Sequence, residues 1–276
     1  MTYHIITTGT VTDNMVNYHN HTILCGHAIG ELDEYILKAI EHGISEFGFS
    51  DHAPVPLHLR QGISMSPEDT ENYITSILEE KYEYKDRVQI KTGFEIDFPL
   101  FDSLQRSYLS DPRIDYIIGS THYMGDWGFD NPAEASRFNE RDIDEIYRDY
   151  YALIEGLVDA DFCDIVGHFD LIKKFGHRPK SDMTPVIRRI ARKMALKGIA
   201  AEINTSGLRK PVGEIYPSDE IINIFFEENV PVTMGSDSHT PDDVCSGYPQ
   251  AREKIRGAGY RKISGFTRRK RHDIQL

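Results

Sequence analysis

The sequence has few of the features that mark secreted or membrane proteins. Its 276 residues include only three cysteines, Cys25, Cys163 and Cys245, an odd and small number that argues against a disulfide framework and predicts reduced thiols. No apolar run approaches the ~18 residues that a membrane-spanning helix needs. The first 30 residues lack a basic segment followed by an apolar one, so secretion is not expected. These absences predict a cytoplasmic protein without a membrane partner.

Positive charge is also scarce over most of the chain. Residues 1–251 hold 22 lysines and arginines against 42 aspartates and glutamates, whereas residues 252–276 hold nine against two. A body this acidic repels the backbone of nucleic acids, so we expect no nucleic-acid partner. The basic end, which includes Arg268, Arg269, Lys270 and Arg271, is interpreted as a solvated terminal segment.

What the sequence does contain is an alternation of short apolar runs with amphipathic stretches. No repeat, low-complexity tract or linker divides it, which predicts a single domain. Leu32, Tyr35, Ile36, Ala39 and Ile40 follow one another at helical spacing, and further helices are predicted to begin at 66, to cover 143–158 and to cover 184–197. The runs predicted as strands are 16–19, 44–50, 88–94, 114–119, 163–167, 199–203 and 230–234.

Seven such alternations predict a parallel sheet flanked by helices. The predicted strands end in polar or metal-ligating side chains, and these ends decide between an open and a closed sheet. In an open sheet, with strands about 4.8 Å apart, the seven ends would spread over ~30 Å. A barrel brings all of them to one mouth, where the active sites of (β/α) barrels form. The sequence therefore predicts an α/β fold whose sheet is a closed seven-stranded barrel.

Seven of the twelve histidines lie at or just beyond the predicted strand ends or in the loop after the first strand, and two carboxylates join them. Imidazole and carboxylate together suit Zn, Mn or Fe, and three or four protein ligands complete one ion. Nine ligands therefore predict two or three divalent cations. The nine candidates are His19, His21, His27, His52, Glu95, His122, His168, Asp237 and His239.

The order of these residues resembles the PHP (polymerase and histidinol phosphatase) superfamily, all nine of whose ligand positions are filled over roughly residues 16–240. Within it, segments 25–28, 52–54, 168–173, 204–210 and 216–218 are similar to those of the monofunctional histidinol-phosphate phosphatases. The resemblance implies a distorted (β/α)7 barrel with a trinuclear metal centre. It also implies a domain at 16–276 behind an N-terminal extension at 1–15, which is longer than the family usually has.

Carried over to this sequence, the resemblance implies three metal sites that share the nine ligands. One holds His19, His21, Glu95 and Asp237. Glu95 bridges to a second ion, which His122 and His168 also bind. The third ion is held by His27, His52 and His239. Asp51, where Glu is common in the family, is expected to accept a hydrogen bond from an imidazole N–H.

Other residues are predicted to act on the substrate. A phosphate monoester is an anion, so divalent ions that neutralise its oxygens and lower the pKa of bound water favour its hydrolysis. Asp170 and His239 are both candidates to protonate the leaving alkoxide, although Asp170 is equally suited to capping a helix. Arg209 is expected to bind the phosphate with its planar guanidinium, and Asn204 to contact the substrate. Lys173 and Lys174 are interpreted as solvated.

The resemblance thus implies hydrolysis of L-histidinol phosphate to L-histidinol and phosphate, a reaction of histidine biosynthesis. The partner is a small phosphorylated metabolite whose ammonium and imidazole an acidic surface attracts. Two alternatives stay open: a metal phosphoesterase that acts on another small phosphomonoester or a nucleic-acid end, and an inactive barrel that only binds metal. The oligomeric state is not predicted.

Overall fold

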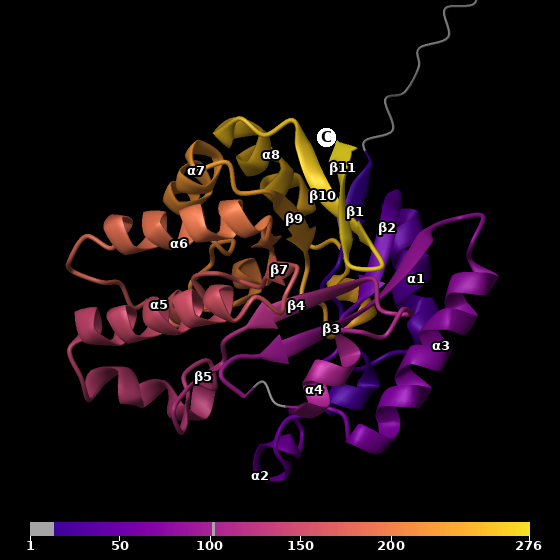
Figure 1. Cartoon of the computed structure of the whole chain (residues 1–276), viewed down its shortest axis with the longest axis horizontal. Helices are drawn as coiled ribbons and strands as arrows, with labels where there is room; N and C mark the ends of the chain where they lie inside the picture. The colour runs from indigo at the N-terminus through magenta and orange to yellow at the C-terminus, as the bar shows by residue number, and fades with distance from the viewer. Residues whose placement is uncertain (1–13, 101–102) are drawn as a thin grey trace, which may run out of the picture.

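The computed structural model describes residues 14–100 and 103–276, and its seven main strands all run parallel (Figure 1). In hydrogen-bonded order they are β1 (Met15–Asn17), β2 (Ile44–Phe49), β3 (Gln89–Asp97), β4 (Tyr116–Ser120), β7 (Ile165–Val166), β8 (Ala200–Asn204) and β9 (Val232–Gly235). The chain after β1 also meets β9, because the Tyr18 N–H donates to the Met234 carbonyl at 3.1 Å. The sheet thus closes into the predicted seven-stranded barrel.

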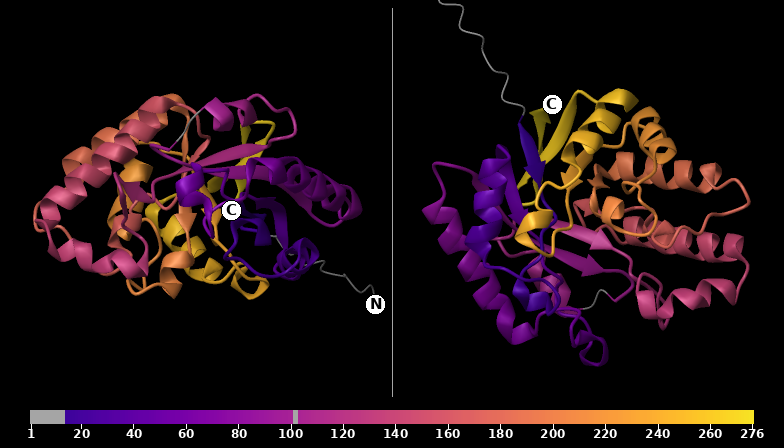
Figure 2. Two further views of the ribbon diagram at one scale, coloured as in Figure 1. Left: turned by 90° about the horizontal axis from the view of Figure 1, so that it is seen from below. Right: turned by 180° about the vertical axis from the view of Figure 1, so that it is seen from behind.

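Helices cover the outside of this barrel. In Figure 1, α5, α6 and α7 lie on one side of the strands and α1 and α3 on the other, and Figure 2 shows the same arrangement from two more directions. The helices of the described residues are α1 (Leu32–Glu41), α2 (Leu57–Arg60), α3 (Thr70–Glu83), α4 (Ser103–Tyr108), α5 (Ile143–Ala160), α6 (Thr184–Lys197), α7 (Asp219–Glu227) and α8 (Tyr248–Ala258). The predicted helices at 143–158 and 184–197 are confirmed.

Local sequence fixes where the two long helices begin and end. Helix α5 begins after Asp142, whose side chain accepts hydrogen bonds from the N–H groups of Asp144 and Glu145. Helix α6 ends at Gly198, which has a φ of 73° that a residue without a Cβ adopts at low cost. These two signals set the edges of the outer layer, in which α5 packs on β4 and α6 on β8.

Aromatic side chains fill the barrel interior. The Tyr116 ring lies across two glycines of neighbouring strands, since a Cβ at Gly48 would come within 2.3 Å of the Tyr116 hydroxyl and a Cβ at Gly93 within 2.5 Å of its ring. That hydroxyl donates to the Tyr18 carbonyl at 2.6 Å. Tyr18 and Tyr116 are both buried. Glycine at 48 and 93 therefore leaves room for the Tyr116 ring in the barrel interior, beneath the polar strand ends.

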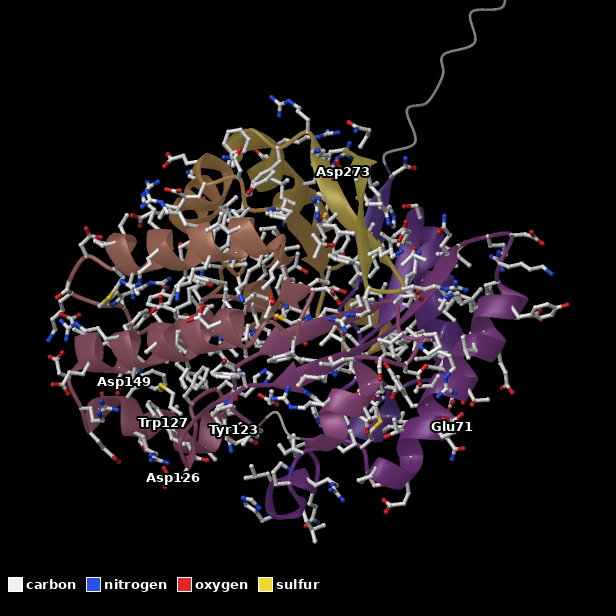
Figure 3. The ribbon with its side chains drawn as sticks, in the orientation of Figure 1. Glu71, Tyr123, Asp126, Trp127, Asp149 and Asp273 are labelled. Carbon is white, nitrogen blue, oxygen red and sulfur yellow. The ribbon has the colours of Figure 1, made fainter. Side chains whose placement is uncertain are left out.

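The basic C-terminal segment is folded, and it is solvated as predicted at Arg268, Lys270 and Arg271 but not at Arg269. It forms an antiparallel hairpin of β10 (Lys262–Thr267) and β11 (Lys270–Gln275) that packs against the amino ends of the barrel strands. Arg269 pairs with Asp164, and its Nη2 donates to the Phe162 carbonyl at 2.7 Å. Figure 3 labels Asp273 on this hairpin, far from Tyr123 and Trp127 in the short antiparallel strands β5 (Tyr123–Met124) and β6 (Trp127–Gly128) that follow β4. The prediction was wrong for Arg269 because its acidic partner is distant in sequence.

The hairpin also covers a buried ion pair. Lys91 Nζ lies 3.1 Å from Glu46 Oε2, and both side chains are almost fully buried. Thr267 Oγ1 accepts a hydrogen bond from Lys91 at 2.8 Å, and His272 Nε2 lies 2.8 Å from Glu46 Oε1. A buried pair is stable only when its remaining donors and acceptors are satisfied. Residues of the hairpin satisfy them here.

Two sequence expectations find support within the described part of the chain. Cys25, Cys163 and Cys245 are buried and form no disulfide. Within residues 14–100 and 103–276, no helix combines the length and the apolar character that a membrane crossing needs. The predicted extension at 1–15 lies outside the described residues except for its last two.

Replacing Arg269 by alanine is expected to lower the free energy of unfolding by about 2–4 kcal/mol, because the change leaves the Asp164 carboxylate half-buried without its cation. Urea denaturation measures the loss. Arg268→Ala is a matched control, since Arg268 occupies the same turn with a positive φ but has an exposed side chain. Equal losses in the two variants would contradict the assigned role of Arg269.

Candidate metal centre

The nine predicted ligands come together at the carboxyl end of the barrel. Glu95 belongs to β3, and the other eight lie in the segments that follow β1, β2, β4, β7 and β9. Seven of them are buried or nearly so, whereas His27 is exposed and His239 is about a quarter exposed. The closed sheet therefore does what the sequence predicted: it collects side chains from both ends of the chain at one mouth.

Glu95 is the centre of this group. Its Oε2 lies 3.1 Å from His52 Nδ1, 3.4 Å from His19 Nε2 and 3.6 Å from His21 Nε2. On the other side of the carboxylate, Oε1 lies 3.0 Å from His168 Nε2 and 3.7 Å from His122 Nε2. A single buried carboxylate thus faces five imidazoles, and each of its two oxygens faces a different subset.

Asp237 and His239 extend the group toward solvent. Asp237 Oδ1 lies 3.4 Å from His21 Nε2 and 3.9 Å from His19 Nε2. The Nε2 atoms of His239 and His27 are 3.0 Å apart, and the ring of His239 stacks on that of His21 with centroids 4.2 Å apart. Contacts therefore run without a break from the buried to the exposed ligands.

Three carboxylates behind the cluster orient the imidazole rings. Asp51 Oδ1 lies 3.3 Å from His21 Nδ1, and Asp97 Oδ1 lies 2.8 Å from His122 Nδ1. Glu202 Oε1 lies 2.7 Å from His19 Nδ1. In each case Nδ1 faces a carboxylate and Nε2 faces the cluster, which is the arrangement typical of metal-ligating histidines.

Asp51 was predicted as such an acceptor, but Asp97 and Glu202 were missed. Both had a signal in the sequence. Asp97 follows Glu95 by two residues, so in a strand it shares the face of Glu95. Glu202 interrupts the apolar run Ala200–Ile203, where an acidic side chain needs a buried partner. An acidic residue inside an apolar strand is thus itself a clue to the site.

The residues fit a group of divalent cations. Buried imidazole nitrogens without a hydrogen-bond partner among the described residues include His19 Nε2 and His21 Nε2, which point into the cluster. An unpaired buried polar atom is costly, and a cation would satisfy it. Sets of three whose ligand atoms lie within 4.8 Å of one another include His19, His21 and Glu95, as well as His21, His52 and His239. The number of ions stays a prediction.

Charge coupling within the cluster shifts several pKa values. Burial alone lowers the pKa of His122, but the carboxylates of Asp97 and Glu95 outweigh it and raise that pKa to about 10. The pKa of His21 rises to about 9, because the carboxylates of Asp237 and Asp51 outweigh its burial. Burial lowers the pKa of His52 to about 4. Protons thus occupy some of the ligands when no cation is bound.

Asp170 lies apart from the nine ligands. Its Oδ2 accepts a hydrogen bond from the Ser218 N–H at 3.0 Å and pairs with Lys173 Nζ at 2.9 Å, while the buried Oδ1 has no partner among the described residues. Burial raises the pKa of this carboxyl. Lys173 was predicted to be solvated and is instead fully buried, since Asp170 and the Ile215 carbonyl hold its ammonium. The role of Asp170 as an acid stays a prediction.

Arg209 and Asn204 are bound mainly to the protein. Arg209 Nη2 donates to the carbonyls of Ser236 and Asp237, and its Nε lies 3.1 Å from Asp243, which leaves the buried Nη1 without a partner among the described residues. Asn204 is buried, and its amide donates to Glu202. Their roles in substrate binding stay predictions, with one free Arg209 nitrogen available for a phosphate.

Comparison with known proteins places the chain in a family. The PHP domain model matches residues 17–206, which is more than half of the sequence. The chain belongs to the PHP family. A relative from Deinococcus radiodurans, named a probable histidinol-phosphatase, is 40% identical over 91% of this chain and 96% of its own length. The histidinol-phosphatase of Bacillus subtilis is 28% identical over 83% of this chain and 95% of its own.

A solved PHP-family structure supports the fold. The histidinol phosphate phosphatase of Lactococcus lactis, crystallised with zinc, L-histidinol and phosphate, superposes with a TM-score of 0.78 at 23% identity. The match covers 94% of this chain and 99% of that protein. The single-domain barrel with seven parallel strands, predicted from the alternation of apolar runs, is thereby confirmed.

The metal-free protein is expected to lose stability as the pH rises from 6.5 to 10. The pKa values of His21 and His122, about 9 and about 10, exceed the unfolded value of 6.5, so their contribution is fully present below pH 6.5 and disappears as the pH passes through 9 and 10. The loss from His21 is about 3 kcal/mol. Thermal denaturation of chelator-treated protein measures it.

His122→Asn is expected to flatten this pH dependence, whereas His42→Asn, which alters an exposed histidine outside the cluster, leaves it unchanged. Because ligation needs deprotonated imidazoles, added zinc should raise the Tm more above pH 8 than at pH 6.5. A zinc-induced shift that is independent of pH would contradict the cluster as the zinc site.

Proposed function

We propose that this chain hydrolyses L-histidinol phosphate to L-histidinol and phosphate at the nine-residue cluster. The observation that carries the proposal is the convergence of seven imidazoles and two carboxylates on one barrel mouth around Glu95. The Deinococcus radiodurans relative, 40% identical over almost its whole length, supports the choice of substrate. The family membership supports a metal-dependent phosphoesterase.

The cations would be held in the way the family resemblance implies. His19, His21, Glu95 and Asp237 would bind one, and Glu95 would be shared with a second. Bound divalent cations neutralise phosphoryl oxygens and lower the pKa of coordinated water. Zn, Mn and Fe all accept these donors, and two or three ions account for nine ligands.

Side chains of the protein would bind the phosphate and give a proton to the leaving group. The buried Nη1 of Arg209 is free to donate to a phosphate oxygen while Nη2 and Nε hold the guanidinium in place. Two groups are candidates to give the leaving alkoxide its proton: Asp170, whose Oδ1 is unpaired, and His239, which lies at the exposed edge of the cluster. Asn204 contributes by holding Glu202.

The acidic surroundings agree with a small metabolite that bears an ammonium group beside its phosphate, rather than with a nucleic acid. The chain carries a net charge of −13, and much of its basic character lies in the C-terminal residues, which pack at the other end of the barrel. An acidic surface attracts the ammonium and imidazole of histidinol phosphate and repels a polynucleotide. A biosynthetic reaction of this kind supports a cytoplasmic location.

The zinc- or manganese-loaded protein is expected to hydrolyse histidinol phosphate with a kcat/KM about 100-fold or more above that for an aryl phosphate, because a site built to bind polar groups rejects substrates that lack them. Steady-state phosphate release measures both. Equal values would overturn the substrate, and release of mononucleotides from a single-stranded oligonucleotide would favour a nucleic-acid end instead. Inactivity toward every phosphoester would leave a barrel that only binds metal.

Arg209→Ala is expected to lower kcat/KM for histidinol phosphate by about 10–100-fold, the effect of losing one charge-assisted hydrogen bond to phosphate. The neighbouring Lys210→Ala is the matched control, since it removes a cation from the same loop. The same loss in both variants would show that the charge of the loop, not the guanidinium of Arg209, accounts for the effect.

A further inference from the structure

Glu202 is a carboxylate inside the barrel that joins two of the predicted ligand segments. It lies in β8 and is 1% exposed. Its Oε1 accepts a hydrogen bond from His19 Nδ1 at 2.7 Å. Its Oε2 accepts one from the backbone N–H of His168 at 2.8 Å and one from the Asn204 side chain at 3.0 Å. Three donors thus meet one carboxylate.

Two of these donors cannot be reversed. The N–H of His168 is a backbone group and can only donate. The amide of Asn204 is fixed in orientation, because its Oδ1 accepts a hydrogen bond from the Ser206 N–H at 2.9 Å, which leaves its NH2 group to face Glu202. Both occupy Oε2, so Oε1 is left for His19.

The third contact decides where the proton of His19 resides. A carboxylate offers only acceptors, so the hydrogen bond to Oε1 requires a proton on Nδ1. The lone pair of a neutral ring then lies on Nε2. That nitrogen faces Glu95 Oε2 at 3.4 Å and Asp237 Oδ1 at 3.9 Å, and it has no hydrogen-bond partner among the described residues.

The backbone leaves space for this contact at one point. A Cβ at Gly235, in β9, would come within 2.0 Å of Glu202 Oε1 and within 2.7 Å of His19 Cβ. Any other residue at this position would displace the oxygen from the ring. Glycine at 235 is therefore part of the same arrangement, in which β8, β9 and the end of β1 hold one imidazole.

We propose that Glu202 is a positioning residue of the metal centre: it holds His19 as the tautomer protonated at Nδ1 and aims Nε2 at the cation. This inference rests on the proposed function, because it assumes that the cluster binds metal. Glu202 itself is not a ligand in this arrangement, since its two oxygens are occupied by His19, His168 and Asn204. Its effect reaches the metal through the ligand residues that it holds, His19 by its ring and His168 by its backbone N–H.

The decisive variant is Glu202→Gln, which keeps size and shape but replaces one oxygen by NH2. The two fixed donors require the amide oxygen at the position of Oε2, so the NH2 group must face His19 Nδ1. His19 must then accept a hydrogen bond at Nδ1 and carry its proton on Nε2. A protonated Nε2 cannot bind the cation. We expect zinc affinity to fall about 10–100-fold. Competition with a zinc chelator of known affinity measures the change.

A second readout follows the proton directly. In zinc-loaded protein labelled with ¹⁵N-histidine, the wild type should show an Nδ1–H signal for His19, assigned by its loss in His19→Asn. That signal should be absent in Glu202→Gln. A general loss of fold would not move the proton of one ring, and circular dichroism checks that the variant is folded.

Glu46→Gln provides the matched control, because it also removes one buried carboxylate from the barrel but at the opposite end, beside Lys91. It should leave zinc affinity and the His19 signal unchanged. If Glu202→Gln does not fold, Glu202→Asp serves, since its shorter side chain keeps the charge but cannot reach both His19 and His168; the same fall in zinc affinity is expected.

The outcomes separate this inference from the proposed function. Unchanged zinc affinity or a retained Nδ1–H signal in a folded Glu202 variant would overturn the role of Glu202 while leaving the metal centre intact. Equal losses in the Glu46 and Glu202 variants would do the same, because buried charge alone would then explain them. A wild type that binds no zinc, manganese or iron would overturn both.

Discussion

The closure of the sheet between the two ends of the chain is the constraint on which the site depends. The His21 N–H donates to the Ser238 carbonyl at 2.9 Å, and the Asn17 side chain donates to Ser236 Oγ at 2.6 Å. These bonds join β1 and the segment after it to the segment after β9. Without them the first two histidines and the last two ligands would lie at opposite edges of an open sheet, and no single cluster could include them.

Closure of the sheet brings charged side chains together, and the carboxylates and imidazoles of the cluster compensate one another's charge. Glu95 and Asp237 are buried carboxylates, and the imidazoles around them hold the pKa of each well below its usual range despite the opposing effect of burial. The same contacts raise the pKa of His122 through Asp97 and Glu95. Protons and divalent cations therefore compete for one set of nitrogens. The carboxylates behind the rings favour the cations by leaving Nε2 directed inward.

Much of this could be predicted from the sequence, and the errors share one cause. The seven barrel strands and the residues near their ends were identified correctly because both depend on neighbours in the chain, whereas the two strands of the C-terminal hairpin were not predicted. The solvated state predicted for Lys173 and for Arg269 was wrong because the fold sets their surroundings. Lys173 has Asp170 three residues earlier, but the Ile215 carbonyl that also holds its ammonium is 42 residues away. Asp164, which pairs with Arg269, is more than a hundred residues away. A charge without a visible local partner looks exposed in a sequence.

The sequence by itself determined which residues could be ligands and predicted that they would gather at one end of a parallel barrel, since strand periodicity and the succession of strands and helices along the chain are local properties. The tertiary structure alone decided which nitrogen of each ring faces the cluster. That choice depends on acceptors such as Asp97 and Glu202, whose distance from an imidazole follows from packing between strands. Hydrogen bonds act over about 3 Å, a scale that only the folded chain defines.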